Sequence, residues 1–421
     1  METVETNQTK MSDEKRRILA IIIGGLILIL LVGGGFYYFE IFRTKKNVAK
    51  AQEIAKQGKD LAWQAKYSEA IPLCQEAMKL DSNNIAAYEC LLRSYDTLRT
   101  ISELEKLSKD YIEKKPQRIN GYLYLSHSYE MQGRFNEAAE WAEKAIELFP
   151  KNSNGYNRLG HVLDRQGNLE LAQKNYETAI SINPQNAYAH QNLGRVFSRL
   201  TDYEKAKEEY ELAKKYSPPK GYIAMESRLN LGYIAYQYEN NVDKAIEYFK
   251  EAIEADPNVA MPYVNLARRY YYLDKVEEAI SLYEKAMKLD DQLTRPYLDL
   301  AEVYLREGKS VDEAIELLEG AEKRLRLDHS ISVRNTERPA NINYFFAAAY
   351  AKKGDLDKAF EYLEKAFRYD KKTLLGEETP AVKINKDVGK NIFTDPLFTE
   401  MKKDPRFSEL ISSEKKTSPN L

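Results

Sequence analysis

Histidine and cysteine are the side chains that most often hold metals or act as nucleophiles, and this chain uses both sparingly. Its 421 residues include four histidines and two cysteines. His127 and His161 are 34 positions apart. Equivalent positions of neighbouring helices are separated by roughly 8–10 Å, too far to share one metal ion easily. Cys74 and Cys90 lack the CxxC spacing of zinc and redox sites. We expect two small apolar side chains there, with a disulfide as the alternative, and we predict no metal site.

The motifs of common enzyme classes are also missing from the sequence. It contains no P-loop, no HExxH, no GxSxG and no glycine-rich dinucleotide-binding turn. Its many carboxylates alternate with lysines, as in KAKEEYELAKK at 205–215, which is typical of a solvated helix face. A formal net charge of −2 argues against a general nucleic-acid binder, which would carry a basic domain or stripe. We predict a protein that is not an enzyme, uses no cofactor and binds no nucleic acid.

A fixed interval of 34 residues separates prolines and small residues along the middle of the chain. Such an interval is typical of helix-turn-helix repeats, in which each unit packs only against its neighbours. Proline lacks the N–H that helix propagation needs, so each proline marks the end of a second helix. The residues that keep the interval are Pro116, Pro150, Pro184 and Pro218, Ala138, Ala172 and Ala206, Gly133 and Gly167, and Gly160 and Gly194.

The repeat is clearest in residues 153–186, which contain Tyr156, Leu159, Gly160, Leu163, Ala172, Tyr176, Ala179 and Pro184. This segment resembles the bacterial type of the tetratricopeptide repeat (TPR) family, whose pattern is W-x2-L-G-x2-Y, then A-x3-F-x2-A, then P. The pattern extends over 51–371 as about nine repeats. Insertions near 219–224 and 325–340 shift its register. The resemblance implies an all-α fold, a right-handed α-solenoid of helix pairs.

Residues 372–411 follow the last repeat and are predicted to cap the array. Their second part, TDPLFTEMKKDPRFSELI at 394–411, resembles the ending of many bacterial TPR proteins. The end of a solenoid needs such a cover because its last repeat has no neighbour. Residues 412–421 are expected to form a flexible tail. The side chains expected to cover the last repeat are Phe398, Met401, Phe407 and Leu410.

An uncharged apolar stretch occupies residues 18–39, between a short tail at 1–17 and a juxtamembrane linker at 40–50. It is long enough to cross the roughly 30 Å hydrocarbon core of a bilayer as a helix. We therefore predict a single-pass transmembrane anchor ahead of the repeats. A cleaved signal peptide is the alternative, although its apolar core is normally shorter. Met11 is an alternative start that would shorten the tail.

The side of the membrane on which the repeats lie is only weakly indicated by the flanking charges. Three basic residues lie close to the apolar stretch on each side, and long domains are translocated largely regardless of charge. Short-tailed single-span proteins of this layout resemble bacterial signal anchors, which favours an extracytoplasmic array. A cytoplasmic array is the alternative, as in other tethered TPR proteins.

The TPR resemblance also implies which residues face a partner. In TPR solenoids the first helix of each repeat lines the concave side, with positions 2, 5, 6, 9, 12 and 13 pointing into it. An asparagine there offers one acceptor and two donors, so a row of asparagines can bond an extended peptide backbone without demanding a sequence. Hydrogen bonds to a neighbouring helix or to water are the alternative. Position 6 of successive repeats is Arg158, Asn192, Asn230, Asn265 and Asp299.

Arginine and tyrosine side chains surround this row, and both types are favoured at binding hot spots. They indicate a protein or extended peptide partner of acidic character. We predict a membrane-tethered TPR scaffold or adaptor. A structural subunit of a larger envelope complex, using its convex or terminal surfaces, is the alternative. The candidate binding residues are Arg158, Asn192, Arg195, Arg199, Asn230, Tyr233, Tyr236, Asn265, Arg268 and Tyr272.

Overall fold

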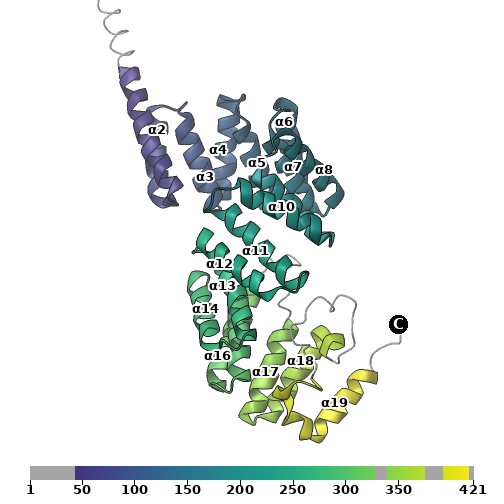
Figure 1. Ribbon diagram of the computed structural model, residues 1–421. Helices are drawn as coiled ribbons and strands as arrows, with labels where there is room; N and C mark the ends of the chain where they lie inside the picture. Colours follow the sequence, from purple (N-terminus) through teal and green to yellow (C-terminus); the bar gives the residue numbers. More distant parts are fainter. Residues whose placement is uncertain (1–42, 328–338, 375–391, 417–421) are drawn as a thin grey trace, which may run out of the picture. The chain divides into compact units, whose positions relative to one another are not determined.

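The computed structural model describes residues 43–327, 339–374 and 392–416, and all regular structure in these ranges is helical. Contacts divide the chain into two compact units, Met1–Asn175 and Tyr176–Leu421, called the first and the second unit below. Figure 1 shows the helices in chain order. No helix within the described ranges is both long enough and apolar enough to span a membrane. The predicted anchor at 18–39 lies outside these ranges.

Helices of the first unit alternate between the first and second helix of each predicted repeat. The earliest described helix already begins at residue 43, so most of the predicted linker at 40–50 is helical. The unit contains the helix at 43–63, α2 (Tyr67–Leu80), α3 (Ile85–Thr97), α4 (Ile101–Lys114), α5 (Ile119–Met131), α6 (Phe135–Leu148), α7 (Ser153–Gln166) and the beginning of α8 (Leu169–Ile182).

The second unit continues the alternation and ends in short helices after the last pair. Its first helices are the odd-numbered ones from α9 to α17. It contains the end of α8, α9 (Ala187–Arg199), α10 (Tyr203–Tyr216), α11 (Tyr222–Gln237), α12 (Val242–Ala255), α13 (Ala260–Tyr272), α14 (Val276–Leu289), α15 (Thr294–Arg306), α16 (Val311–Leu327), α17 (Pro339–Lys353), α18 (Leu356–Leu374), the 3₁₀ turns η2 (Pro396–Phe398) and η3 (Met401–Lys403), and α19 (Pro405–Lys416).

Small residues allow the two helices of a pair to lie close together. A Cβ atom added to Gly194 on α9 would lie 2.9 Å from the ring of Tyr210 on α10. A Cβ atom added to Gly232 on α11 would lie 2.4 Å from the ring of Phe249 on α12. The alanine positions of the second helices are also fully buried, as Ala206 on α10 is 0 % exposed. This packing explains the glycine and alanine positions of the repeat, because large rings fill the space that small residues leave.

The two cysteines form a disulfide, so the expectation of two separate apolar side chains is wrong. Cys74 on α2 and Cys90 on α3 are bonded, with 6.4 Å between their Cα atoms. Both are buried, at 0 % and 1 % exposure. Cys74 occupies a small-residue position of a second helix, where the next first helix packs closely. That packing brings the two thiols together although the sequence spacing matches no cysteine motif.

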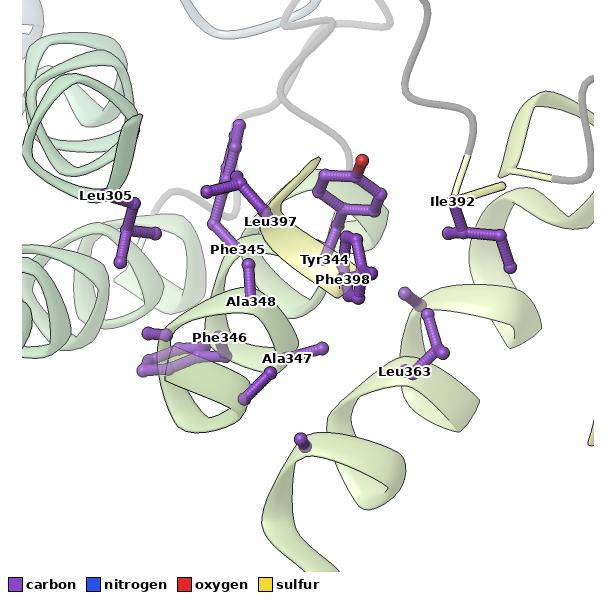
Figure 2. Packing of buried hydrophobic residues seen from close by; sticks show 14 of the residues in the cluster. Leu305, Tyr344, Phe345, Phe346, Ala347, Ala348, Leu363, Ile392, Leu397 and Phe398 are labelled. Carbon is purple, nitrogen blue, oxygen red and sulfur yellow. The ribbon is translucent and has the colours of Figure 1, made fainter. Parts of the chain in front are cut away.

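The C-terminal segment packs against the last helix pair, as Figure 2 shows for Leu397 and Phe398 beside Tyr344 on α17. Phe398 and Met401 are 0 % exposed and Phe407 is 7 % exposed. Leu410 is partly buried against the same cluster. Phe398, Met401, Phe407 and Leu410 therefore pack against the apolar side of the last pair.

Asp395 fixes this segment to two earlier helices. Its carboxylate accepts hydrogen bonds from Arg306 Nη1 and Nη2 on α15 at 3.3 and 3.0 Å. It also accepts one from the Tyr344 hydroxyl at 2.6 Å and one from the Leu397 backbone N–H at 3.0 Å. Burial alone would raise the pKa of Asp395, but these hydrogen bonds and the Arg306 charge lower it. The buried carboxylate is thus held ionised and fully paired.

The breaks in the repeat interval coincide with longer helices. At the first predicted insertion, α11 begins at Tyr222 after Gly221, whose N–H donates to the Ala255 carbonyl at 2.9 Å. At the second, the predicted loop 325–340 is helical at both ends, because α16 continues to Leu327 and α17 begins at Pro339. The sequence pattern does not distinguish an extra turn of helix from a polar loop, so it did not predict that these helices are longer.

The predicted boundaries after the last repeat also shift. Helix α18 continues to Leu374, into the segment predicted to be the cap. Helix α19 continues to Lys416, so the part of the tail from 412 to 416 is helical. Pro405 begins α19, at the one helical position where the missing N–H costs nothing.

Replacing Gly232 with alanine tests the close packing of α11 and α12. In an open helix this change stabilises by about 1 kcal/mol. Here the new Cβ would meet the ring of Phe249, so we expect the free energy of unfolding to fall by about 1–3 kcal/mol. Denaturant titration monitored by circular dichroism measures it.

Two further variants complete this test. Gln237→Ala, at an exposed position of the same helix, should stay within about 0.5 kcal/mol of the wild type. Phe249→Leu should cancel part of the Gly232→Ala effect, because neighbouring residues are not additive. An unchanged or raised stability of Gly232→Ala would contradict the packing argument.

Candidate functional site

The predicted binding residues are distributed over both units. Arg158 lies on α7 in the first unit, and the other nine lie in the second unit on α9, α11 and α13. All ten are therefore on first helices, as the repeat register predicts. The surroundings of each side chain are described below within its own unit.

The asparagine row uses part of its hydrogen-bonding capacity inside the second unit. Asn230 donates from Nδ2 to the Glu226 carbonyl of its own helix at 2.8 Å. Asn265 donates from Nδ2 to the Met261 carbonyl at 3.0 Å. It also donates to the hydroxyl of Tyr233, on the preceding first helix, at 2.7 Å. Hydrogen bonding to a neighbouring helix, the alternative for this row, thus occurs at Asn265. Asn192 on α9 is 6 % exposed.

A buried arginine on α13 lies between two of the predicted tyrosines. The guanidinium carbon of Arg269 is 3.5 Å from the ring centroid of Tyr236 and 5.0 Å from that of Tyr272. Arg269 is 4 % exposed, whereas Tyr272 is 45 % exposed. The sequence analysis selected Arg268 and missed Arg269. The signal for it was Tyr272 three residues later on the same helix face.

Arg268 takes part in an ion-pair network with the next repeat. It donates from Nη2 to Oδ1 of Asp299 on α15 at 3.0 Å. Arg295 donates from Nε to the same carboxylate atom at 3.1 Å. The carboxylate of Asp299 therefore links Arg268 on α13 to Arg295 on α15 through charge-assisted hydrogen bonds.

The first helix α11 also carries a carboxyl group, that of Glu226. Glu226 lies one turn before Asn230, at position 2 of its repeat. Burial raises the pKa of Glu226, and the Arg195 charge and the Asn230 side-chain hydrogen bond offset this only in part. A carboxyl that gains a proton more easily repels an acidic partner less.

Arg158 is held by a buried carboxylate of the first unit that the sequence analysis missed. Its guanidinium contacts Glu130 on α5 and donates from Nε to the Ser126 hydroxyl at 3.0 Å. His161 Nδ1 lies 3.1 Å from the same carboxylate, and Arg165 Nη1 lies 3.6 Å away. Burial opposes ionisation of Glu130, but the His161 hydrogen bond and the Arg158 charge outweigh it and lower its pKa. Arg158 therefore joins α7 to α5.

The remaining histidines with described surroundings also pair with carboxylates. His127 Nδ1 is 2.5 Å from Asp96 Oδ1, and His190 Nδ1 is 2.7 Å from Glu209 Oε2. Within the described ranges, no group of three or more histidine, cysteine, aspartate or glutamate side chains could hold a metal ion.

His190 is placed to carry a proton in the second unit. It is 3 % exposed, and its Nε2 lies 3.0 Å from the Pro184 carbonyl. Glu209 and the carbonyl are both acceptors, so both ring nitrogens can donate only in the imidazolium form. Burial lowers the pKa of His190, but the bonds to Glu209 and to Pro184 outweigh it and raise the pKa.

The stability of the fold should therefore depend on pH through His190. A raised folded-state pKa adds stability that is fully present below the unfolded value of about 6.5 and is lost as pH rises through the folded value. We expect the free energy of unfolding to decline with pH in this window. Denaturant titrations at several pH values measure it.

Three variants identify the group responsible for this decline. His190→Gln should remove the decline. Glu209→Gln should move it to lower pH because the carboxylate that raises the pKa is gone. Glu208→Gln, an exposed neighbour of Glu209, is the control and should leave it unchanged. The same decline in the His190→Gln variant would refute this assignment.

Family models for the tetratricopeptide repeat match two segments of the chain, 119–289 and 340–373. The individual matches are described as "Tetratricopeptide repeat" at 119–152, 141–174, 192–260, 259–289 and 340–373 and as "TPR repeat" at 165–200. These segments are thus tetratricopeptide repeats. No curated protein sequence matches the chain.

Solved structures with a similar fold include a chain of the "APC/C hetero-tetramer Cut9-Hcn1". The two share 16 % identity over 74 % of this chain and 55 % of that one, with a TM-score of 0.53. This chain thus spans about half the length of that relative. "YrrB: a TPR protein with an unusual peptide-binding site" shares 21 % identity over 46 % of this chain and 95 % of its own, with a TM-score of 0.35. PilW, a "type IV pilus biogenesis factor", shares 18 % identity over 51 % of this chain and 92 % of its own, with a TM-score of 0.43.

Proposed function

We propose that the tetratricopeptide repeats at 119–289 and 340–373 make this chain a membrane-tethered adaptor, which holds a polypeptide partner along its first helices. Stacked helical repeats serve as extended surfaces for binding other proteins. The proposal places the partner on the second unit, along α9, α11 and α13, where nine of the ten candidate residues lie.

The observation that carries the proposal is the exposure of one tyrosine on each of these three helices. Tyr188, Tyr222 and Tyr272 are 58 %, 57 % and 45 % exposed. Tyrosines at the packing position of the second helices, such as Tyr210 and Tyr283, are each 1 % exposed. Packing therefore does not account for the three exposed rings. Tyrosine supplies large and rigid contact area, which makes it a frequent anchor in binding interfaces.

Arginine side chains on α13 and α15 support an acidic partner. Arg268 and Arg295 both donate hydrogen bonds to the carboxylate of Asp299, which shows that guanidinium groups here are placed to bind carboxylates. Arg269 adds a further positive charge between Tyr236 and Tyr272. A carboxylate of a partner would meet planar guanidinium groups, which bind carboxylates through paired hydrogen bonds.

The membrane part of the proposal rests on residues 18–39, whose uncharged length suits a single transmembrane helix. The disulfide between Cys74 and Cys90 supports an array on the extracytoplasmic side, because disulfides persist in oxidising compartments and are rare in the cytosol. We propose that the anchor leaves the repeats outside the cytoplasm, with the disulfide in the repeats nearest the membrane.

Removing the exposed tyrosines tests the proposed binding surface. We expect the double variant Tyr188→Ala and Tyr272→Ala to recover at least about tenfold less of its partner after cross-linking in cells, because each anchor contributes about 1–2 kcal/mol. Quantitative mass spectrometry of the purified complexes measures the recovery.

Tyr369→Ala is the matched control for this experiment. Tyr369 is 59 % exposed but lies on the second helix α18, so its loss should not affect recovery. These tyrosines are better probes than the asparagine row, because Asn265→Ala would also remove a bond between α11 and α13. Equal recovery from the double variant and the wild type would sink the proposed surface. A fixed complex insensitive to all these changes would favour a structural subunit.

The side of the membrane is tested by the redox state of the cysteines. Cells are quenched with acid, and the denatured protein is treated with a maleimide polymer that adds mass to each free thiol. We expect no mass increase without reductant and two additions after reduction. The Cys74→Ser variant should show one addition under both conditions. Two additions in the unreduced wild type would place the repeats in a reducing compartment.

A further inference from the structure

A small pocket is found in the first unit, whereas the exposed tyrosines Tyr188, Tyr222 and Tyr272 belong to the second unit. Its volume is about 160 Å³, and it is formed by the helix at 43–63, α3 and α5. We call it the Trp63 pocket. Small-molecule sites usually measure roughly 300–1000 Å³, so this one has room for a single side chain. Its lining residues are Lys59, Ala62, Trp63, Glu89, Cys90, Arg93, Asn120 and Tyr124.

The repeat register assigns every one of these lining residues to the face that contacts partners. Within their repeats, the residues occupy only positions 2, 5, 6, 9, 12 and 13, which the TPR resemblance assigns to the inner side. Asn120 is at position 2 of its repeat, for example, and Lys59 and Arg93 are both at position 9. Ala62 and Cys90 are buried in the hydrophobic core of these helices, and the other six lining residues are partly or largely exposed. The Trp63 pocket therefore belongs to the partner-facing side of the first unit.

An arginine and a tryptophan form its wall. The guanidinium carbon of Arg93 lies 4.1 Å from the ring centroid of Trp63. Trp63 is 63 % exposed, an unusual position for so large an apolar ring. At this distance the guanidinium interacts favourably with the face of the ring, and its planar set of N–H donors suits a carboxylate. The ring also gives the methylene stem of an incoming side chain an apolar surface.

Within the described part of the chain, no ion pair joins Arg93 directly to a carboxylate. Glu89, one turn earlier on α3, pairs with Lys59 at 3.2 Å. Asp96, about one turn later, pairs with His127 at 2.5 Å. Arg93 Nε is buried and has no hydrogen-bond acceptor among the residues that the structure describes. A buried donor without an acceptor is unfavourable, and an added acceptor, best an anion, would relieve this.

We infer that the Trp63 pocket receives the carboxylate of an acidic side chain, best a glutamate, from a polypeptide partner. The carboxylate accepts hydrogen bonds from the edge of Arg93, and the stem of the side chain lies against Trp63. Asn120 and Tyr124 contribute further polar groups to the lining of the pocket. The inference extends the proposed function to the first unit and relies on it only for the kind of partner, a polypeptide.

Fluorescence of Trp63 tests this inference directly. The chain contains two tryptophans, and Trp141→Phe leaves Trp63 as the one reporter. The probe is the peptide acetyl-Ser-Glu-Leu-Glu-Ser-amide, added to the full-length protein in detergent at concentrations up to about 1 mM, where weak single-site binding is still visible. We expect a saturable change in Trp63 emission. The twin peptide with glutamine in place of both glutamates should bind at least about tenfold more weakly.

Variants of the protein separate the pocket from general charge effects. Arg93→Gln should weaken binding of the glutamate peptide at least about tenfold. The matched control is Arg134→Gln, because Arg134 also stacks on an aromatic ring, that of Tyr129 at 4.2 Å, but pairs through Nε with Glu137 at 2.9 Å. This control should bind like the parent, and circular dichroism should show that both variants are folded.

Three results would overturn the inference: no saturable change with the glutamate peptide, equal binding of the glutamine twin, or unchanged binding by Arg93→Gln. An equal response to inorganic phosphate would also overturn it, since it would indicate a site for any anion. The outcome is independent of the tyrosine experiment. The tyrosine variants test the surface of the second unit, and the peptide titration tests the Trp63 pocket. Either proposal can therefore fail while the other is supported.

Discussion

The close approach of the two helices within a pair is the constraint on which the rest of the structure depends. It is possible only where a small residue faces a large ring, as Gly194 faces Tyr210 and Gly232 faces Phe249. The helix separation then decides which positions are buried in every repeat. Polar and aromatic side chains that do not fit between helices remain on the outer parts of the first helices. The proposed binding surface thus consists of side chains that helix packing does not constrain, so their types can differ from one repeat to the next.

Most of the fold follows from the repeat interval, because each repeat contacts only its neighbours and its pattern is local. The helix pairs and the buried Tyr176, Tyr210 and Tyr283 are predictable in this way. The extra turns of α11 and α16 are not, since a lengthened helix and a polar loop leave similar sequences. The disulfide between Cys74 and Cys90 is not predictable either. Two small apolar side chains at the same positions would satisfy the pattern equally well.

The sequence predicts the helices and repeat positions of the candidate residues, but it does not predict which side chains contact each other. The register places all ten selected residues on first helices, yet it does not say which side chain meets which. Arg158 pairs with Glu130 from the preceding repeat, and Asn265 bonds Tyr233 of the preceding first helix. Arg269 was missed because its burial depends on Tyr236, which lies 33 residues earlier. Such contacts depend on side-chain conformations between repeats, and no spacing rule within one repeat contains them.

The Asp395 contacts have a consequence for the length of the array. In a stack of like units, the last unit presents the same apolar side that every earlier unit uses to receive its successor. Here that side receives Phe398 and Met401 instead, and Asp395 locks them in place through Arg306 and Tyr344. In the part of the chain that the structure describes, the apolar side that a second copy would need for continuing the stack is therefore already occupied by the chain's own residues. The C-terminal segment of the same polypeptide thus ends the stack, and this blocks end-to-end polymerisation through the C-terminal side of the array.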